Sequence, residues 1–278
     1  MAGLLRNTRS LFRPLAALAL AALPLAGCGG SSGPVRAVGT CVIKPEAQCP
    51  GAKLAGTKLA GVDLSSADLT GATFSRADLT GADLTKAKLG GATFSSATVS
   101  EVKLAGADLS GATMANLDLS GVDLSGANLT KSDLSGANLA KANLSGATLN
   151  RVNLSGADLS EANLSGAILG RANLNAAKLT KANLQGAVLT KADLSEANLQ
   201  GADLSGGANL TAAEFDQANL SGAKLRGAYI SGTLFADADL TETDLTDAYV
   251  DSAAVGGAKL TGMILAGCRG AGCDAFRG

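Results

Sequence analysis

Residues 127–139 read ANLTKSDLSGANL, and they show the unit from which most of the chain is built. An apolar residue recurs at every fifth position from Leu54 to Leu204, 31 times without interruption, and 12 more times from Leu210 to Leu265. The residue two places before it is small, usually Ala, and the residue between the two is usually Asp or Asn. The chain is therefore one long array of five-residue repeats.

A period of five matches neither an α-helix nor a straight β-strand. Each step of five residues advances an α-helix by about 140° past a full turn, which would scatter the leucines around the helix. In a straight strand, side chains alternate, so leucines five apart would fall on opposite faces. The pattern predicts three extended residues, with Ala and Leu inward, followed by a Ser-Gly or Thr-Gly corner where glycine accepts a positive φ. Each pentapeptide then forms one side of a coil.

The bulky replacements of Leu predict how many sides close the coil. Phe74 and Phe94 lie 20 residues apart, as do Phe215 and Phe235. One extra residue at Gly206-Gly207 separates the two pairs, and subtracting it places all four phenylalanines in one register. Four pentapeptides per turn would stack them in one column. A duplicated 20-residue gene segment would give the same spacing, but duplication alone does not predict that the register survives the insertion.

These repeats resemble those of the pentapeptide-repeat family, whose A(D/N)LXX motif is matched by Ala67-Asp68-Leu69-Thr70-Gly71 and many of its neighbours. The resemblance covers residues 51–267. It implies an all-β fold, a right-handed quadrilateral parallel β-helix with about four repeats per coil and with the central Leu or Phe inward. We assign residues 51–265 to this β-helix and residues 266–278 to a C-terminal cap that carries a Cys pair. The family is diverse, so the resemblance alone implies little about function.

The N-terminus resembles a bacterial lipoprotein signal peptide over residues 1–27. Arg6, Arg9 and Arg13 precede an apolar run, which ends in Leu25-Ala26-Gly27-Cys28. The resemblance implies cleavage before Cys28 and lipidation of that residue, and more than one acyl chain gives stable anchoring. An ordinary secretory peptide with a chance Cys is the alternative. Either reading predicts export, and the first predicts a rod anchored to a bacterial cell membrane or outer membrane, facing the periplasm or the exterior.

Residues 28–50 are expected to hold the lipidated Cys, a flexible Gly- and Ser-rich tether and an N-terminal cap. Four further cysteines, Cys41, Cys49, Cys268 and Cys273, allow three disulfide connectivities. The 43 repeats would make a rod about 50 Å long at an inter-strand spacing of about 4.8 Å, and a disulfide needs Cα atoms within about 7 Å. Bonds between the two ends are thereby excluded, which leaves Cys41 with Cys49 and Cys268 with Cys273. A metal site is the alternative for these cysteines, but the chain has no His and neither pair is C-x₂-C.

The balance of charge indicates no general nucleic-acid binding. Removing residues 1–27 takes three of the 23 basic residues and leaves 20 against 24 acidic residues, a net charge of −4. The distribution is more informative. Four basic residues spaced by 20 should form one vertical column, a candidate anion-binding site: Lys131, Arg151, Arg171 and Lys191. The alternative is that these side chains extend into solvent, with Asp133 and Asp193 nearby.

Two further groups of charges invite interpretation. On the opposite side Lys141, Glu161 and Lys181 alternate in sign, which indicates a structural role. Near the C-terminus the carboxylates could hold Ca²⁺, meet a basic partner or form a solvated acidic surface: Asp237, Asp239, Glu242, Asp244, Asp247 and Asp251. The column of Asn143, Asn163 and Asn183 predicts a ladder of side-chain hydrogen bonds.

The sequence offers no catalytic constellation, because it has no His and because Ser and Asp are abundant only at repeat positions. We therefore expect neither an enzyme nor a cofactor. The favoured hypothesis is an envelope-anchored binding scaffold or spacer that contacts a protein or an anionic envelope polymer through its outer faces. The alternative comes from the family resemblance, because some members mimic DNA and bind type II topoisomerases. The net charge of −4, the signal and the basic column weigh against it.

Overall fold

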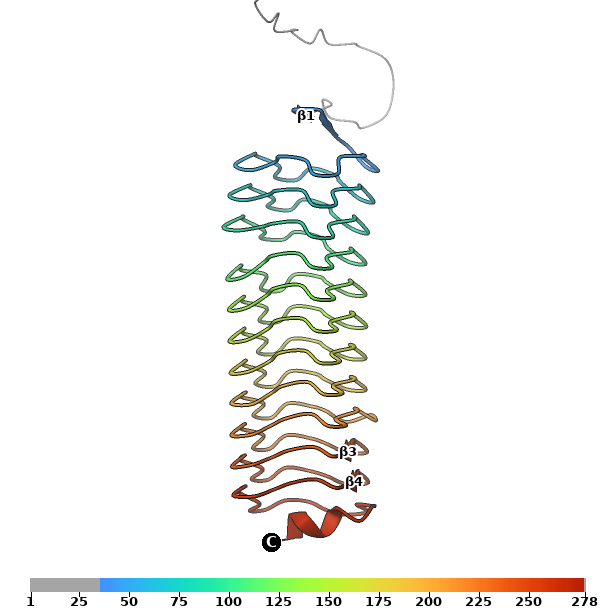
Figure 1. The fold of residues 1–278 in the computed structure, drawn as a ribbon, viewed down its shortest axis with the longest axis vertical. Helices are drawn as coiled ribbons and strands as arrows, with labels where there is room; N and C mark the ends of the chain where they lie inside the picture. Colours follow the sequence, from blue (N-terminus) through green and yellow to red (C-terminus); the bar gives the residue numbers. More distant parts are fainter. Residues whose placement is uncertain (1–35, 278) are drawn as a thin grey trace, which may run out of the picture. The chain divides into compact units, whose positions relative to one another are not determined.

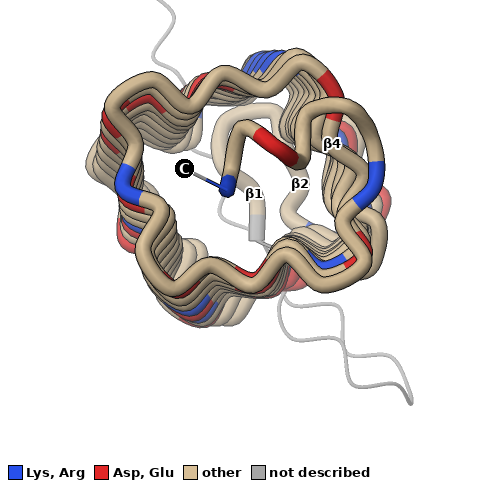
Figure 2. The backbone as a smooth tube through the Cα atoms, turned by 90° about the horizontal axis from the view of Figure 1, so that it is seen from below, with Lys and Arg blue, Asp and Glu red and all other residues tan. Residues whose placement is uncertain are grey.

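The computed structural model describes residues 36–277, which wind into a stack of four-sided turns (Figures 1 and 2). Each side pairs with the side 20 residues further along through a parallel bridge, such as that between Asn143 and Asn163. The step is 21 residues only across Gly206-Gly207, where Val188 pairs with Asn209, and it returns to 20 where Asn209 pairs with Tyr229. Four pentapeptides therefore make one turn, and the extra residue is confined to one corner.

Regular strands are few. In the N-terminal cap β1 (Arg36–Val38) pairs with β2 (Cys41–Ile43) in an antiparallel hairpin. β3 (Tyr229–Ser231) pairs with β4 (Tyr249–Asp251) in parallel, and the 3₁₀-helix η1 (Cys273–Arg277) ends the chain. Most other sides contribute a single bridged residue, because only about three extended residues lie between corners. The predicted β-helix is thus a hydrogen-bonded coil in which continuous strands are rare.

The inward side chains fill the coil. The Leu and Ala positions from Leu64 to Val250 are buried almost throughout, most of them with no exposed surface. The rings of Phe74 and Phe94 stack with their centroids 4.9 Å apart, and those of Phe215 and Phe235 stack at 5.2 Å. Both stacks were expected from the 20-residue spacing. The bridge between Asp193 and Glu214 confirms that the register survives the insertion.

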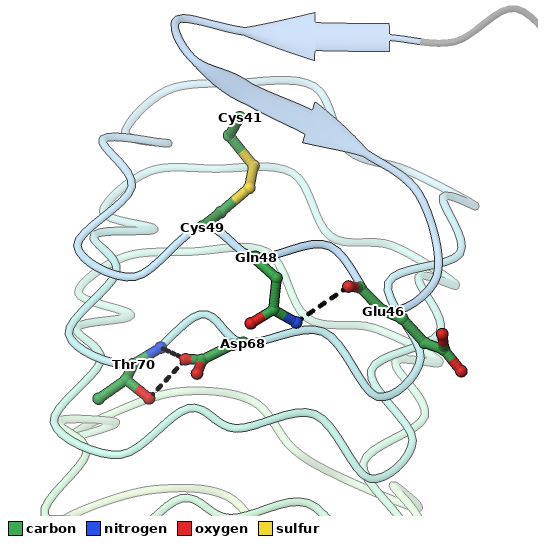
Figure 3. Close-up of a disulfide and its surroundings, with 6 residues drawn as sticks. All are labelled: Cys41, Glu46, Gln48, Cys49, Asp68 and Thr70. Carbon is green, nitrogen blue, oxygen red and sulfur yellow. Dashed lines mark hydrogen bonds between the residues drawn. A yellow bond between two sulfur atoms is a disulfide. The ribbon is translucent and has the colours of Figure 1, made fainter.

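The outward Asp or Asn of each repeat builds the corner that follows it. Oδ1 of Asp68 accepts hydrogen bonds from the backbone N–H and the hydroxyl of Thr70, at 3.1 and 2.8 Å (Figure 3). The next residue takes a positive φ, 66° at Gly71 and 57° at Arg151. The corner thus depends on an acceptor outside the predicted Ser-Gly or Thr-Gly pair, usually the Asp or Asn two places before the N–H donor.

Each end of the coil is tied by a disulfide. Cys41, at the start of β2, is bonded to Cys49 in the first turn of the coil (Figure 3), with their Cα atoms 5.4 Å apart, and Cys268 is bonded to Cys273 at 6.1 Å. This is the pairing that the length of the rod predicts. At the C-terminal end Phe276 of η1 is buried with its ring edge against Phe235, at a centroid distance of 5.9 Å. The last turn keeps partly exposed apolar residues.

Within residues 36–277 no helix is both long enough and apolar enough to cross a membrane. The signal-like segment and Cys28 lie outside the described residues.

Candidate functional site

The four cations of the predicted column occupy one corner of four successive turns, and we call this column the basic edge: Lys131, Arg151, Arg171 and Lys191. All four have φ between 57° and 60° and exposed side chains. At the glycines that occupy the same corner in earlier turns, such as Gly91 and Gly111, an added Cβ would meet no atom within 4 Å. The corner therefore points each side chain away from the rod.

No partner within the described residues neutralises the basic edge. Several lysines elsewhere pair with a carboxylate one turn away, as Lys103 does with Asp83 at 3.5 Å. Among residues 36–277 none of the four cations has a carboxylate oxygen within 4.0 Å. Asp133 and Asp193 instead accept backbone N–H groups of their own corners. The turns lie about 4.8 Å apart, and two like charges at about 4 Å repel by about 1 kcal/mol in water, so an anionic ligand would relieve the repulsion.

A shallow groove of about 320 Å³ runs along this edge. It is lined by Arg151, Arg171 and Lys191 together with Asn150, Gly170 and Thr190. Gly170 leaves room for the side chain of Asn150, whose Oδ1 would lie 2.6 Å from a Cβ added there. An amide, a hydroxyl and three cations side by side suit a phosphate or carboxylate oxygen. The spacing of charges in the sequence does not predict the three uncharged lining residues, although Gly170 stands where most repeats carry Ser or Thr.

The opposite edge is neutralised in part, because of its three alternating charges Lys141 and Glu161 form an ion pair and Lys181 has no carboxylate partner among residues 36–277. Lys141 Nζ lies 3.9 Å from an oxygen of Glu161. On one of the two sides that meet at this edge, Asn163 donates to Asn143 and Asn183 donates to Asn163, both at 3.2 Å. The predicted asparagine ladder is confirmed. The asparagine side is thus hydrogen-bonded within the protein and leaves few polar groups for a ligand.

The acidic residues near the C-terminus do not form one cluster. Asp237, Glu242 and Asp247 occupy three successive corners, so they point in different directions around the rod. Asp239 pairs with Lys259 at 3.2 Å, and Asp244 pairs with Arg226. Across residues 36–277 no three His, Cys, Asp or Glu side chains converge into a possible metal site. The Ca²⁺ interpretation lacks a site, because the coil distributes carboxylates that are neighbours only in sequence.

The aspartates that titrate abnormally are those that build corners. A hydrogen bond from the hydroxyl of Thr70, supported by the N–H of the same residue, holds the pKa of Asp68 below its usual range. Thr241 lowers the pKa of Asp239 in the same way, with help from Lys259. For Asp244 burial acts to raise the pKa, but hydrogen bonds from Thr246 and Arg226 outweigh burial, and the pKa is lowered. These shifts stabilise carboxylates, which is a structural role.

The repeat geometry can be compared with known proteins. The sequence profile described as pentapeptide repeats matches in 8 copies, over residues 47–85, 87–126, 127–166, 167–206, 207–247 and 224–262. The chain belongs to the pentapeptide-repeat family. Membership of the pentapeptide-repeat family implies a right-handed β-helix solenoid, and the four-sided coil with its 20-residue pairing agrees with this architecture.

Several solved pentapeptide-repeat proteins are similar to this chain. HetL of the cyanobacterium Nostoc sp. strain PCC 7120, a protein involved in the regulation of heterocyst differentiation, is 34% identical over 78% of this chain and 89% of its own, with a TM-score of 0.38. Rfr23 of the cyanobacterium Cyanothece 51142 is 31% identical over 40% of this chain and 89% of its own, with a TM-score of 0.39. QnrB1, a plasmid-mediated fluoroquinolone resistance protein, is 19% identical over 71% and 91%, with a TM-score of 0.34. A comparison with curated proteins finds no match.

Proposed function

We propose that this pentapeptide-repeat protein is exported, lipid-anchored at Cys28 and non-catalytic, and that it serves as a binding scaffold or spacer through its outer faces. The observation that carries the proposal is the sequence Leu25-Ala26-Gly27-Cys28 directly after a basic and apolar N-terminus. Two disulfides at the ends of the coil suit an oxidising compartment outside the cytoplasm.

The filled interior supports a role for the outer faces. Side chains such as Leu144 and Leu164 have no exposed surface, so the bore is packed with the protein's own residues. A ligand of the described part of the chain therefore meets the sides, the corners or the ends. Among these surfaces the basic edge, with its groove and its four cations, is the strongest candidate for contact with an anionic component of the envelope.

The anchor is tested by replacing one atom. In Cys28→Ser the thiol that would carry the thioether-linked lipid is absent, so we expect the protein to move from the membrane fraction to soluble or precursor form and to lose labelling by a radioactive fatty acid. Ser32→Ala, four residues further on, is the matched control and should fractionate like the wild type. Unchanged membrane fractionation of the Cys28→Ser protein would remove the claim of lipid anchoring.

A further inference from the structure

One side of the coil carries no carboxylate over six successive turns. We call it the tyrosine side, and with its two edges it comprises residues 126–131, 146–151, 166–171, 186–191, 206–212 and 227–232. In the next turn Tyr249 continues the column between Asp247 and Asp251, where the carboxylate-free stretch ends. These six ranges contain no Asp or Glu. In the same turns the other three sides do carry carboxylates, for example Asp133, Asp158 and Asp203. The tyrosine side is therefore electrostatically distinct.

The tyrosine side also gathers exposed apolar surface. Its central column places Ile168, Tyr229 and Tyr249 outward with 40%, 54% and 45% of their surface exposed. The two tyrosine rings, on β3 and β4, have centroids 6.5 Å apart. Leu234, 38% exposed, follows Tyr229 across the corner at Gly232. Among the described residues only two other large apolar side chains are as exposed, Val42 and Ile264.

The two edges of the tyrosine side differ in a way that suits a flat contact. One edge is the basic edge, which the tyrosine side shares with the neighbouring side that contains Asp133. The other edge is formed by glycines, among them Gly126, Gly146 and Gly166, and a Cβ added at any of these three would meet no atom within 4 Å. A planar partner could therefore approach without meeting a projecting side chain on the glycine edge, while the cations reach outward on the opposite edge.

We propose that the tyrosine side lies lengthwise against an anionic membrane surface. The inference rests on the proposed export of the rod to a membrane, and it names the anionic component as lipid headgroups. Lys and Arg are attracted to anionic headgroups while their stems follow apolar surface. Tyr has an apolar ring and a polar hydroxyl, which suits the boundary between headgroups and acyl chains. The exposed Ile168 adds apolar contact.

A soluble polyanion accounts for less of this surface. It would bind the four cations, but it would make no favourable contact with the exposed side chains of Ile168 and Tyr229. The absence of carboxylates continues past Lys191, the last cation, into the turns of Asn209 and Tyr229. An anionic membrane accounts for both the exposed apolar side chains and the absence of carboxylates. Its negative surface would repel a carboxylate wherever the rod touches it.

The test uses the full mature chain with Cys28→Ser, so that no acyl chain contributes to binding. Vesicles of equal parts phosphatidylglycerol and phosphatidylcholine, with brominated acyl chains, are compared with vesicles of phosphatidylcholine alone. The protein has no Trp and only two Tyr, so its intrinsic emission comes from Tyr229 and Tyr249. We expect co-flotation with the anionic vesicles, quenching of that emission by the bromines, and release at about 1 M salt, where the Debye length is about 3 Å.

Variants separate the two contributions. Replacing Lys131, Arg151, Arg171 and Lys191 with Gln should weaken vesicle binding on the order of 100-fold, within the limit of roughly fivefold per basic residue. The double variant Tyr229→Ser and Tyr249→Ser should weaken vesicle binding about tenfold and should leave the salt dependence of binding unchanged. The matched control replaces four exposed lysines elsewhere with Gln and changes the net charge equally: Lys103, Lys141, Lys178 and Lys181. It should retain most of the affinity.

Four results would overturn the proposal. These are no binding of the wild-type rod to anionic vesicles, binding without quenching of tyrosine emission, equal loss in the control variant, and binding to soluble poly(glycerol phosphate) in place of vesicles. The last result would identify the partner as a polymer. None of them bears on acylation at Cys28, which the fractionation experiment decides separately, so the two proposals fail independently.

Discussion

The outward Asp or Asn carries two structural tasks in one residue. Its Oδ1 accepts the N–H two places on, as Asn153 does from Ser155 at 3.2 Å, and this bond shapes the corner. An Asn can also donate its amide to the preceding turn, as Asn153 does to Asp133 at 3.0 Å. Asp lacks that donor but accepts the corner bonds as a charged group, which strengthens them.

Acid should weaken the coil through these aspartates. The pKa values of Asp68, Asp78 and Asp239 are lowered from the ordinary 3.8, chiefly by the hydroxyl of the Thr two places on. A lowered folded-state pKa means that the stabilisation is fully present above about pH 5 and is lost as the pH falls through the folded-state values. The urea midpoint should therefore stay level from pH 7 to about pH 5 and fall between about pH 4 and pH 2.

The matched control is the triple variant Asp68→Asn, Asp78→Asn and Asp239→Asn. Asn keeps the Oδ1 acceptor, as Asn128 shows with Thr130 at 3.2 Å, so the coil should form. Its urea midpoint should fall less steeply with acid than that of the wild type. Parallel acid profiles would show that these carboxylates contribute nothing to the pH dependence.

The caps are the elements that the repeat does not specify. At the C-terminal end η1 is bonded to the last turn through Cys268 and Cys273, and its Phe276 packs on Phe235. Val255, Leu260 and Leu265 of the last turn are nevertheless only partly buried. In a solenoid each turn is stabilised mainly by its neighbours, so the end turns open first.

Phe276→Ala should loosen that end alone. Removal of a buried phenyl ring costs about 3–5 kcal/mol in a well-packed core, and nearest-neighbour coupling confines the effect to adjacent turns. We expect amide hydrogen exchange to accelerate in residues 252–269 and to stay unchanged in residues 126–191. Arg277→Ala, which removes a mostly exposed side chain, is the control and should change neither segment. Faster amide hydrogen exchange over the whole coil would contradict the expectation that the effect stays in the turns next to Phe276.

At the scale of the whole molecule, the distribution of charge argues against imitation of DNA. Duplex DNA carries one negative charge per about 1.7 Å, so a segment of about 50 Å carries about 30. Without residues 1–27 the chain has 24 acidic and 20 basic residues, and within the described residues its basic edge is a line of cations without carboxylate partners. A surface that replaces DNA in a basic enzyme groove needs far denser negative charge.

Purified mature protein should accordingly leave the supercoiling activity of DNA gyrase unaffected. The assay titrates the protein into a relaxed-plasmid reaction and reads the topoisomers on an agarose gel, with a gyrase-inhibiting quinolone as the positive control. Clear, concentration-dependent inhibition by the protein alone would restore the topoisomerase-binding interpretation.

The sequence by itself determined the coil. A period of five with buried Leu and Ala permits no helix or straight strand, the four phenylalanines predicted four sides per turn, and the length of the rod left one disulfide pairing. The asparagine ladder and the basic column also follow from spacing alone, because residues 20 apart must stack once the turn has four sides.

Only the tertiary structure decided which side chains lie next to each of these columns. It showed that the acidic C-terminal residues are dispersed around the rod, that the basic edge has no carboxylate partner within the described residues, and that Asn150 and Thr190 join its groove. It also placed Tyr229 and Tyr249 in the column that contains Ile168, with Tyr229 in the last turn of the side without carboxylates. The physical reason is that contact between adjacent sides depends on how each corner aims its side chains, and a one-dimensional period carries no information about that direction.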